Sequence, residues 1–219
     1  DLDVFLEDSP TENSLKRRLS RLSESQKISV DFEAVVTHEL SDTINQLSSQ
    51  SSCDWLVMGW DGRPTTGIFI TNPIGWLLAN INSNLALYRD NGVRYVGKVL
   101  LALRPGRKDK NFISIAKNVC DYFGGSLTLL HVLPENSSTT ETVKHRSEEK
   151  LKQSGVDAEV LILKSADPVE TISETSASYD LLILGTPEKD NWINVLFGGG
   201  KDKFTEKAAC SVLRITLKD

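Results

Sequence analysis

The run Gly198-Gly199-Gly200-Lys201 is the part of the sequence whose residue types best suit phosphate binding. Glycines let a backbone approach an anion closely, and a neighbouring cation attracts negative charge. The run is not a Walker A loop, because the spacing GxxxxGK followed by Ser or Thr is absent. The residues therefore indicate a phosphate-compatible turn and no more.

Three histidines, His38, His131 and His145, could act as acid–base groups, but none has a nucleophile at a motif spacing. His131 lies within the apolar segment "LTLLHVL", so we expect a buried, hydrogen-bonded side chain. The signatures GxSxG, HExxH and HxE followed by CxxC are all absent from the sequence. We therefore predict that the chain has no catalytic residues and is not an enzyme.

The cysteines Cys53, Cys120 and Cys210 lie far apart, without CxxC spacing. Each is in or beside an apolar stretch, so we expect small buried hydrophobic side chains in a reducing compartment. Structural zinc takes four ligands, and scattered cysteines and histidines do not readily supply them. The sequence thus predicts no metal site.

The composition is that of a globular protein, with 39% hydrophobic and 25% charged residues. A formal net charge of -5 argues against a surface that binds nucleic acid. No stretch approaches the roughly 18 apolar residues of a membrane span. The sequence begins with Asp1 rather than methionine, and we expect it to be part of a larger protein.

An internal repeat organises these residues. "VDFEAVV" begins at Val30 and "VDAEVLI" at Val156, an offset of 126 residues (156 − 30). "DWLVMGW" begins at Asp54 and "DLLILGT" at Asp180, again 126 residues apart (180 − 54). We interpret both blocks as strands, with a capped helix between them in each copy. "LDVFLE" (2–7) corresponds less closely to "LTLLHVL" (127–133).

The second copy has an opening that the first copy lacks. "VGKVLLALRP" is a continuous apolar run, typical of a strand buried on both faces, and an amphipathic helix, "NFISIAKNVCDYFGG", follows it. Strands alternating with helices predict a parallel sheet with right-handed crossovers. We therefore divide the chain into an incomplete first unit, 1–93, and a second unit, 94–219.

The order of elements resembles the universal stress protein family. Its members typically open with a strand like "KILVAVDGS" and close with GxxG, nine residues, GS, a helix and "CPVLVV". Here the opening is "KVLLALRPG" (98–106), and "CSVLRI" (210–215) stands in the place of the last strand. The resemblance implies an α/β fold of two such units (adenine nucleotide alpha hydrolase-like), with mainly parallel five-stranded sheets, the first lacking its opening strand and helix.

Carried over residue by residue, the family's nucleotide site is degenerate. Gly185 matches the first glycine, but Glu188 replaces the second and places a carboxylate where phosphate would lie. Gly198 is correctly spaced, whereas Gly199 stands in place of a hydroxyl residue, and Arg104 replaces the strand-end aspartate. Like charges about 4 Å apart repel by ~1 kcal/mol in water and by more near a protein surface. Gly200 and Lys201 compensate only in part.

The first copy keeps another part of this pattern, Gly59, Gly62 and Arg63. Nine residues beyond Gly62 the sequence reads Asn72-Pro73 rather than Gly-Ser. The glycines here are better interpreted as a turn after a buried strand.

Large apolar residues gather after this turn. They are Trp60, Phe69, Ile74, Trp76 and Leu77. We favour the interpretation that this segment covers an edge of the sheet. The alternative is an association surface, because Trp and Phe are enriched at the centres of interfaces.

Tandem units with eroded nucleotide motifs look like the C-terminal domains of the amino acid–polyamine–cation transporter superfamily. The resemblance implies a non-catalytic regulatory or dimerisation domain on the cytoplasmic face of the cell membrane. Cation–chloride cotransporters come first as the host protein, and amino-acid permeases second. In this hypothesis the partners are the transmembrane domain of the same polypeptide and a second copy, without nucleic acid or cofactor.

The alternative hypothesis is a soluble tandem universal stress protein that binds ATP or another adenine nucleotide. In that case Gly185, Gly198, Gly199 and Lys201 would hold the phosphates. Nucleotide binding distinguishes the two hypotheses.

Overall fold

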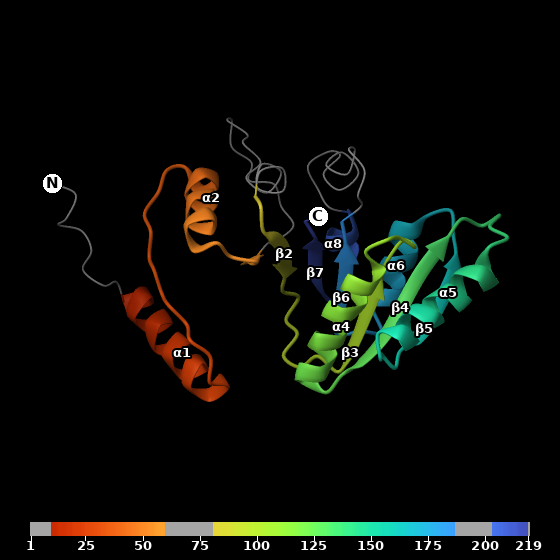
Figure 1. Cartoon of the computed structure of the whole chain (residues 1–219), viewed down its shortest axis with the longest axis horizontal. Helices are drawn as coiled ribbons and strands as arrows, with labels where there is room; N and C mark the ends of the chain where they lie inside the picture. The colour runs from red at the N-terminus through yellow and green to blue at the C-terminus, as the bar shows by residue number, and fades with distance from the viewer. Residues whose placement is uncertain (1–9, 60–80, 187–202, 219) are drawn as a thin grey trace. The chain divides into compact units, whose positions relative to one another are not determined.

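The computed structural model describes residues 10–59, 81–186 and 203–218. The chain divides into two compact units, Asp1–Thr43 and Ile44–Asp219. This division does not coincide with the boundary at residue 93, which concerns the repeat and stays a prediction. Figure 1 shows the elements in chain order, from red to blue.

The described part of the first compact unit contains α1 (Pro10–Gln26), which has no buried residue. Lys16 of α1 forms an ion pair with Glu12 at 3.2 Å and lies 5.7 Å from the centre of the Phe32 ring. The helix α2 (Leu40–Ser51) begins in this unit and continues into the second.

The strand that we predicted from "VDFEAVV" is not formed. Residues 28–36 have no regular secondary structure. Its repeat counterpart, β5 (Glu159–Lys164), pairs with β4 (Ser126–Leu133) and gains its hydrogen bonds there. The first-copy counterpart of β4 is the segment 2–7, which lies outside the described residues. Val36 is 88% exposed, as expected for an extended segment without a neighbouring strand.

The second compact unit contains a seven-stranded sheet in the order β1-β2-β7-β6-β3-β4-β5. Five strands, β7-β6-β3-β4-β5, are parallel and form the sheet predicted for the second copy. The other strands are β1 (Trp55–Gly59), β2 (Asn84–Arg89), β3 (Lys98–Ala102), β6 (Leu181–Gly185) and β7 (Ser211–Thr216).

Helices cover both faces of the five parallel strands (Figure 1). On one face, α4 (Asp109–Phe123) and α5 (Thr140–Gln153) contribute to a buried cluster with Val99, Leu101 and Ile183. On the other face, α6 (Pro168–Ser176) and α8 (Lys203–Lys207) pack beside Leu100 and Leu182. The α/β class is thus confirmed.

Local sequence sets the ends of these helices. At α6, the Asp167 carboxylate accepts the backbone N–H groups of Val169 and Glu170, and Pro168 begins the helix. The helix α4 ends at Gly124, whose φ of 69° is in the left-handed region that glycine adopts without strain.

The strand β3 is buried on both faces, which explains its continuous apolar sequence. Val99, Leu100 and Leu101 are each 0% exposed. Parallel strands covered by helices on both sides need apolar residues at every position rather than at alternate ones. The sequence prediction for this segment is confirmed.

The repeat is visible in the sheet itself. β1 and β6 differ by 126 positions, and each pairs in parallel with the next strand along the chain, β2 or β7. The resemblance led us to expect a separate sheet for each unit. Instead, β2 pairs antiparallel with β7, so β1 and β2 extend the sheet of the second copy. The edge of β7 is covered by this pairing, which removes an exposed strand edge.

Within residues 10–59, 81–186 and 203–218, no helix is both long and apolar enough to cross a lipid bilayer.

Candidate functional site

The strand order reverses between β3 and β6, and this is the place where open α/β sheets bind ligands. The chain leaves β3 through α4 toward β4 on one side, whereas β6 lies on the other side. Residues at the carboxyl ends of β3 and β6 are therefore the candidates for a site. Gly185 ends β6, and Arg104 follows β3 by two residues.

The crevice beside Gly185 is filled by a side chain of the protein itself. A Cβ atom at Gly185 would lie 2.9 Å from Cζ of Phe112, closer than such atoms approach in proteins. Phe112 is 7% exposed and belongs to the core cluster on the α4 face. Because Gly185 has no side chain, the Phe112 ring packs directly against its backbone. The resemblance implied a nucleotide at this point.

The amino end of α4 is also occupied. The carboxylate of Asp109 accepts the N–H of Gly106 on both oxygens, at 3.0 and 3.1 Å. The ammonium group of Lys150 donates to Asp109 Oδ2 and to the carbonyl of Gly106. Asp109 is 5% exposed. Its negative charge lies at the start of α4, where the helix dipole favours an anion.

Arg104 is exposed. Gly59 ends β1 in the same way as Gly185 ends β6, but no atom of the described residues lies within 4 Å of a Cβ placed there. The two repeats therefore differ at their equivalent glycines. Only Gly185 is packed against a ring.

The other predicted residues of the nucleotide site and of the interface lie outside the described residues. They are Gly62, Arg63, Glu188, Gly198, Gly199, Gly200 and Lys201 for the site, and Trp60, Phe69, Ile74, Trp76 and Leu77 for the interface.

Arg214 is a buried cation that the sequence analysis did not single out. It lies within β7 and is 3% exposed. Its guanidinium donates to the carbonyl of Gly185 at 3.4 Å, and Cζ lies 5.8 Å from the centre of the Phe204 ring. The available signal was an arginine between Leu213 and Ile215 in an otherwise apolar strand, because arginine is rarely fully buried without partners.

His131 is a structural residue, as its apolar context predicted. Its Nδ1 lies 2.8 Å from the carbonyl of Leu103, and Nε2 lies 2.9 Å from the hydroxyl of Ser147. Because a carbonyl only accepts, Nδ1 carries the proton and Nε2 accepts from Ser147. Burial lowers the pKa of His131, although the backbone carbonyl of Leu103 opposes the shift. The imidazole is therefore neutral in the folded protein.

The cysteines differ from one another more than we predicted. Cys120 and Cys210 are buried, and burial raises the pKa of both thiols, that of Cys210 to about 11. Cys53 is only partly buried, which corrects the prediction for this residue. Hydrogen bonds between the Cys53 thiol and the hydroxyls of Ser48 and Ser83 lower the pKa of Cys53. All three are free thiols.

Across the described ranges, no group of three or more His, Cys, Asp or Glu side chains is arranged to hold a metal ion. The described part of this end of the sheet is packed, and Lys150 forms an ion pair with Asp109 at the start of α4. It brings together Gly185, Phe112 and Arg214, with Asp109 and Lys150 at the start of α4.

Comparison with known proteins identifies the fold. No protein-family model matches the chain, and no curated protein matches its sequence. Among solved structures, a universal stress protein from Archaeoglobus fulgidus DSM 4304 matches all of this chain and 81% of its own, with a TM-score of 0.71 and 16% identity.

Two structures from Pseudomonas aeruginosa are also similar. A putative universal stress protein from strain UCBPP-PA14 matches 93% of this chain and 78% of its own, with a TM-score of 0.64 and 16% identity. A functionally unknown protein from strain PAO1 matches 94% of this chain and 78% of its own, with a TM-score of 0.64 and 15% identity. The chain therefore has the universal stress protein-like fold.

Proposed function

We propose that the chain is a non-catalytic regulatory and dimerisation module with a universal stress protein-like fold and without a bound nucleotide. The observation that carries this proposal is the contact between Phe112 and the backbone at Gly185. The ring of a core side chain packs against the end of β6, where the resemblance implied a nucleotide. The module acts through its surfaces rather than through a reaction.

Charge at the start of α4 supports the same conclusion. Asp109 already supplies the negative charge that the helix start attracts, and Lys150 neutralises it from α5. A phosphate at this position would have to displace or oppose a carboxylate that is 5% exposed.

Titration calorimetry with ATP tests the proposal on the full chain. We expect no heat of binding up to millimolar ATP, and no turnover of ATP to ADP. Micromolar binding that a Gly198→Val substitution weakens would contradict the proposal, because it would place phosphate at the glycine-rich turn. Turnover that is lost on substitution of Arg104 or Lys201 would contradict the non-catalytic part.

The host protein in this proposal is a membrane transporter, with a cation–chloride cotransporter as the first candidate. The support is the resemblance of tandem, eroded units to the C-terminal domains of such transporters. The three similar structures are not described as parts of transporters. The module would lie on the cytoplasmic face of the membrane, form a homodimer and contact the transmembrane domain of its own polypeptide.

The coding sequence upstream of Asp1 tests this assignment directly. Ten or so hydrophobic spans of about 20 residues each would support a transporter. A short polar leader would contradict it, while leaving the non-catalytic module intact. The two parts of the proposal therefore fail separately.

A soluble tandem protein that binds an adenine nucleotide is the second candidate. It is favoured by one feature, the retention of Gly185 at the end of β6 together with Gly198 and Gly199 further along. The fold itself is common to both candidates. Calorimetry with ATP separates them, since only the second requires binding in the micromolar range.

A further inference from the structure

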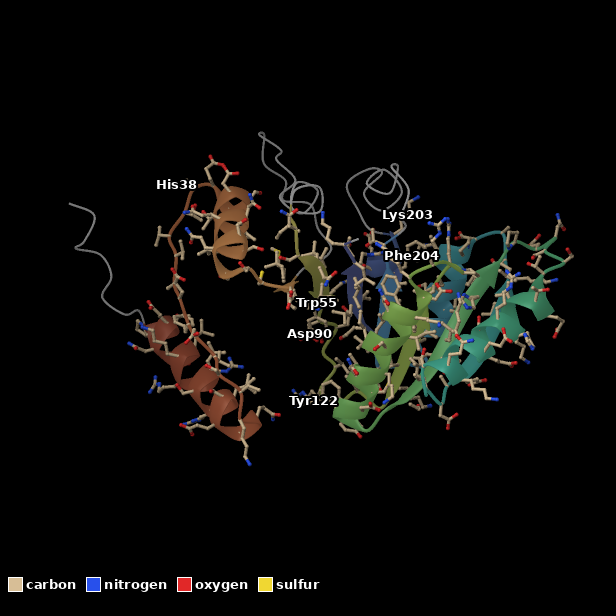
Figure 2. The ribbon with its side chains drawn as sticks, in the orientation of Figure 1. His38, Trp55, Asp90, Tyr122, Lys203 and Phe204 are labelled. Atoms are coloured by element: carbon tan, nitrogen blue, oxygen red, sulfur yellow. The ribbon has the colours of Figure 1, made fainter. Side chains whose placement is uncertain are left out.

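The loop between β3 and α4, residues 103–108, is held in place from the helix α5. Figure 2 labels Tyr122 near the last turn of α4, and the loop lies at the opposite end of that helix. Two side chains of α5 reach the loop, one directly and one through a buried histidine. They are Lys150 and Ser147, which are three residues apart and therefore lie on the same side of α5.

Lys150 holds the loop directly. Its ammonium group donates to the carbonyl of Gly106 at 3.1 Å and to the carboxylate of Asp109. The same carboxylate accepts the N–H of Gly106 at 3.0 Å. Both backbone groups of Gly106 are therefore bound by one ion pair.

Ser147 holds the loop through His131. Nδ1 of the ring donates to the carbonyl of Leu103, the first residue of the loop, at 2.8 Å. Nε2 accepts from the hydroxyl of Ser147 at 2.9 Å. His131 is 1% exposed and Ser147 is 5% exposed. This arrangement fits only the neutral ring, because Nε2 of a protonated ring donates and cannot accept.

A proton on His131 would change the bond to α5. The ring would donate from Nε2, so the hydroxyl of Ser147 would have to turn and donate elsewhere. A serine within a helix can donate to the carbonyl four residues earlier, which is that of Val143 here. The bond survives with its direction reversed.

The same proton would also act on the ion pair that holds Gly106. The charges that act on the ring are those of Asp109 at the start of α4 and Lys150 on α5, in opposite directions. The neighbours of the ring in the sheet, Leu103 and Ile162, carry no charge. A positive ring attracts the carboxylate and repels the ammonium group, and the interior screens these charges poorly.

Of the two members of this pair, Lys150 is the one that can leave. Its side chain is 29% exposed, whereas that of Asp109 is 7% exposed. A lysine side chain can keep its stem against the protein and turn its ammonium group into water. The protonated ring would then supply the positive charge near Asp109 that Lys150 withdraws.

We propose that His131 is a pH switch that controls the β3–α4 loop. With the neutral ring, Lys150 binds Gly106 and the loop is held. With the protonated ring, Lys150 moves into solvent and the loop is released. Burial lowers the pKa of His131 below its ordinary value of 6.5, so the loop is held at neutral pH and is released under acidic conditions. This inference goes beyond the proposed function, because it concerns a response to pH and holds whatever the host protein.

Amide exchange of the full chain, measured by NMR while the His131 ring is titrated, tests the proposal. After correction for the effect of pH on intrinsic exchange, the protection of the Gly106 amide should fall by roughly tenfold or more as the ring binds its proton. Leu101 should keep its protection, because β3 stays paired with β4 and β6.

Two results of this titration would overturn the proposal. One is loss of protection at Leu101 together with Gly106, because the sheet would then be unfolding rather than releasing a loop. The other is a ring that stays neutral down to the pH at which the whole chain unfolds.

A His131→Gln variant tests whether the ring is the cause. The neutral amide of glutamine can donate to Leu103 and accept from Ser147, so Gly106 should stay protected over the same pH range. His145→Gln is the matched control, because His145 is exposed on the same helix and should leave the native response unchanged. A native response in the His131→Gln variant would contradict the assignment.

Linkage supplies a second test that leaves His131 intact. If a proton on the ring releases Lys150, removal of Lys150 must in turn favour the proton on the ring. In a Lys150→Met variant, His131 should titrate at a higher pH than in the native chain, and Gly106 should be less protected at pH 7. Lys152→Met, at an exposed lysine of α5, should match the native chain in both respects. An unchanged His131 titration or native protection of Gly106 in the Lys150→Met variant would refute the switch.

Discussion

Leu87 of β2 and Arg214 of β7 lie directly opposite each other in the antiparallel pair that joins the two repeats, and each is the other's repeat counterpart. β2 and β7 correspond at an offset of 127 residues (211 − 84). The pairs Leu85–Thr216 and Arg89–Val212 are exchanged by the same relation. The centre of the pairing is therefore a local two-fold axis within one chain.

Hydrogen bonds at the two ends of this pair obey the same relation. The N–H of Asn91 donates to the hydroxyl of Ser211 at 2.9 Å, and the N–H of Lys218 donates to the side-chain oxygen of Asn84 at 3.1 Å. The offset of 127 converts one bond into the other. Such isologous pairing is the geometry of a two-fold dimer, here formed between repeats of one polypeptide.

The first prediction concerns the side chain that links the ends of β2 and β7. The amide of Asn91 donates to the carbonyls of Ala208 and Cys210, at 3.2 and 2.8 Å. An Asn91→Ala substitution removes both donors and should lower the free energy of unfolding by about 1–2 kcal/mol. Urea denaturation measures the change. The exposed Asn136 provides the control, because Asn136→Ala should leave the unfolding midpoint where it is.

The second prediction tests the packed crevice. A Gly185→Ala substitution adds a Cβ that would meet the Phe112 ring at 2.9 Å, so we expect a loss of about 1–3 kcal/mol in the free energy of unfolding. Gly59→Ala is the matched control, because Gly59 ends the equivalent strand and has nothing within 4 Å. It should leave stability unchanged or slightly higher. Equal losses at both glycines would contradict the role assigned to Phe112.

Parts of this crevice could be predicted from the sequence. The family resemblance singles out the glycine at the end of β6, and the continuous apolar run predicts the buried strand β3. The ring that fills the crevice could not be predicted, because the sequence shows that Phe112 lies on the apolar face of a helix but not what that face meets. Near the end of this helix, the structure buries Cys120 and leaves Phe123 38% exposed. The position of the sheet relative to α4 determines which side chains of this helix are buried.

Contacts between distant residues account for the rest. Lys150 and Asp109 are separated by 41 residues and meet only because α4 and α5 lie on the same face of the sheet. The segment 30–36 has a strand-like sequence and no strand, because a strand also needs a neighbour with which to pair. The local sequence pattern predicts the secondary structure that a segment favours. The neighbouring strands and helices determine whether that structure forms.

The third prediction concerns the pair at the start of α4. A Lys150→Met substitution leaves the carboxylate of Asp109, whose side chain is 7% exposed, without its cation. Removing one partner of a buried ion pair costs about 3–5 kcal/mol, and we expect about 2 kcal/mol because the side chain of Lys150 is still 29% exposed. Thermal or urea unfolding measures this loss.

The matched control for that pair is Lys207→Met. Lys207 contacts Glu170 on the surface, where both side chains are about half exposed and solvent screens the charges. We expect little change in the unfolding midpoint. If both substitutions had the same effect, burial of Asp109 would not be the reason for the loss at Lys150.

The last prediction is a dependence of stability on pH that originates at His131. Burial lowers the pKa of this residue below its ordinary value of 6.5, so the folded protein holds the neutral ring when the unfolded chain already binds a proton. The stabilisation is therefore fully present above about pH 6.5 and is lost as the pH falls below it.

Asp109 and Lys150 also act on the ring, in opposite directions, and both stay in place in the test. Between pH 7 and pH 5, the free energy of unfolding should fall more steeply in the native protein than in a His131→Gln variant. A His145→Gln variant should keep the native dependence, because His145 is exposed on α5 with a side chain that is 73% accessible. If the difference between native and His131→Gln proteins were constant over this range, the buried ring would not be the group that titrates.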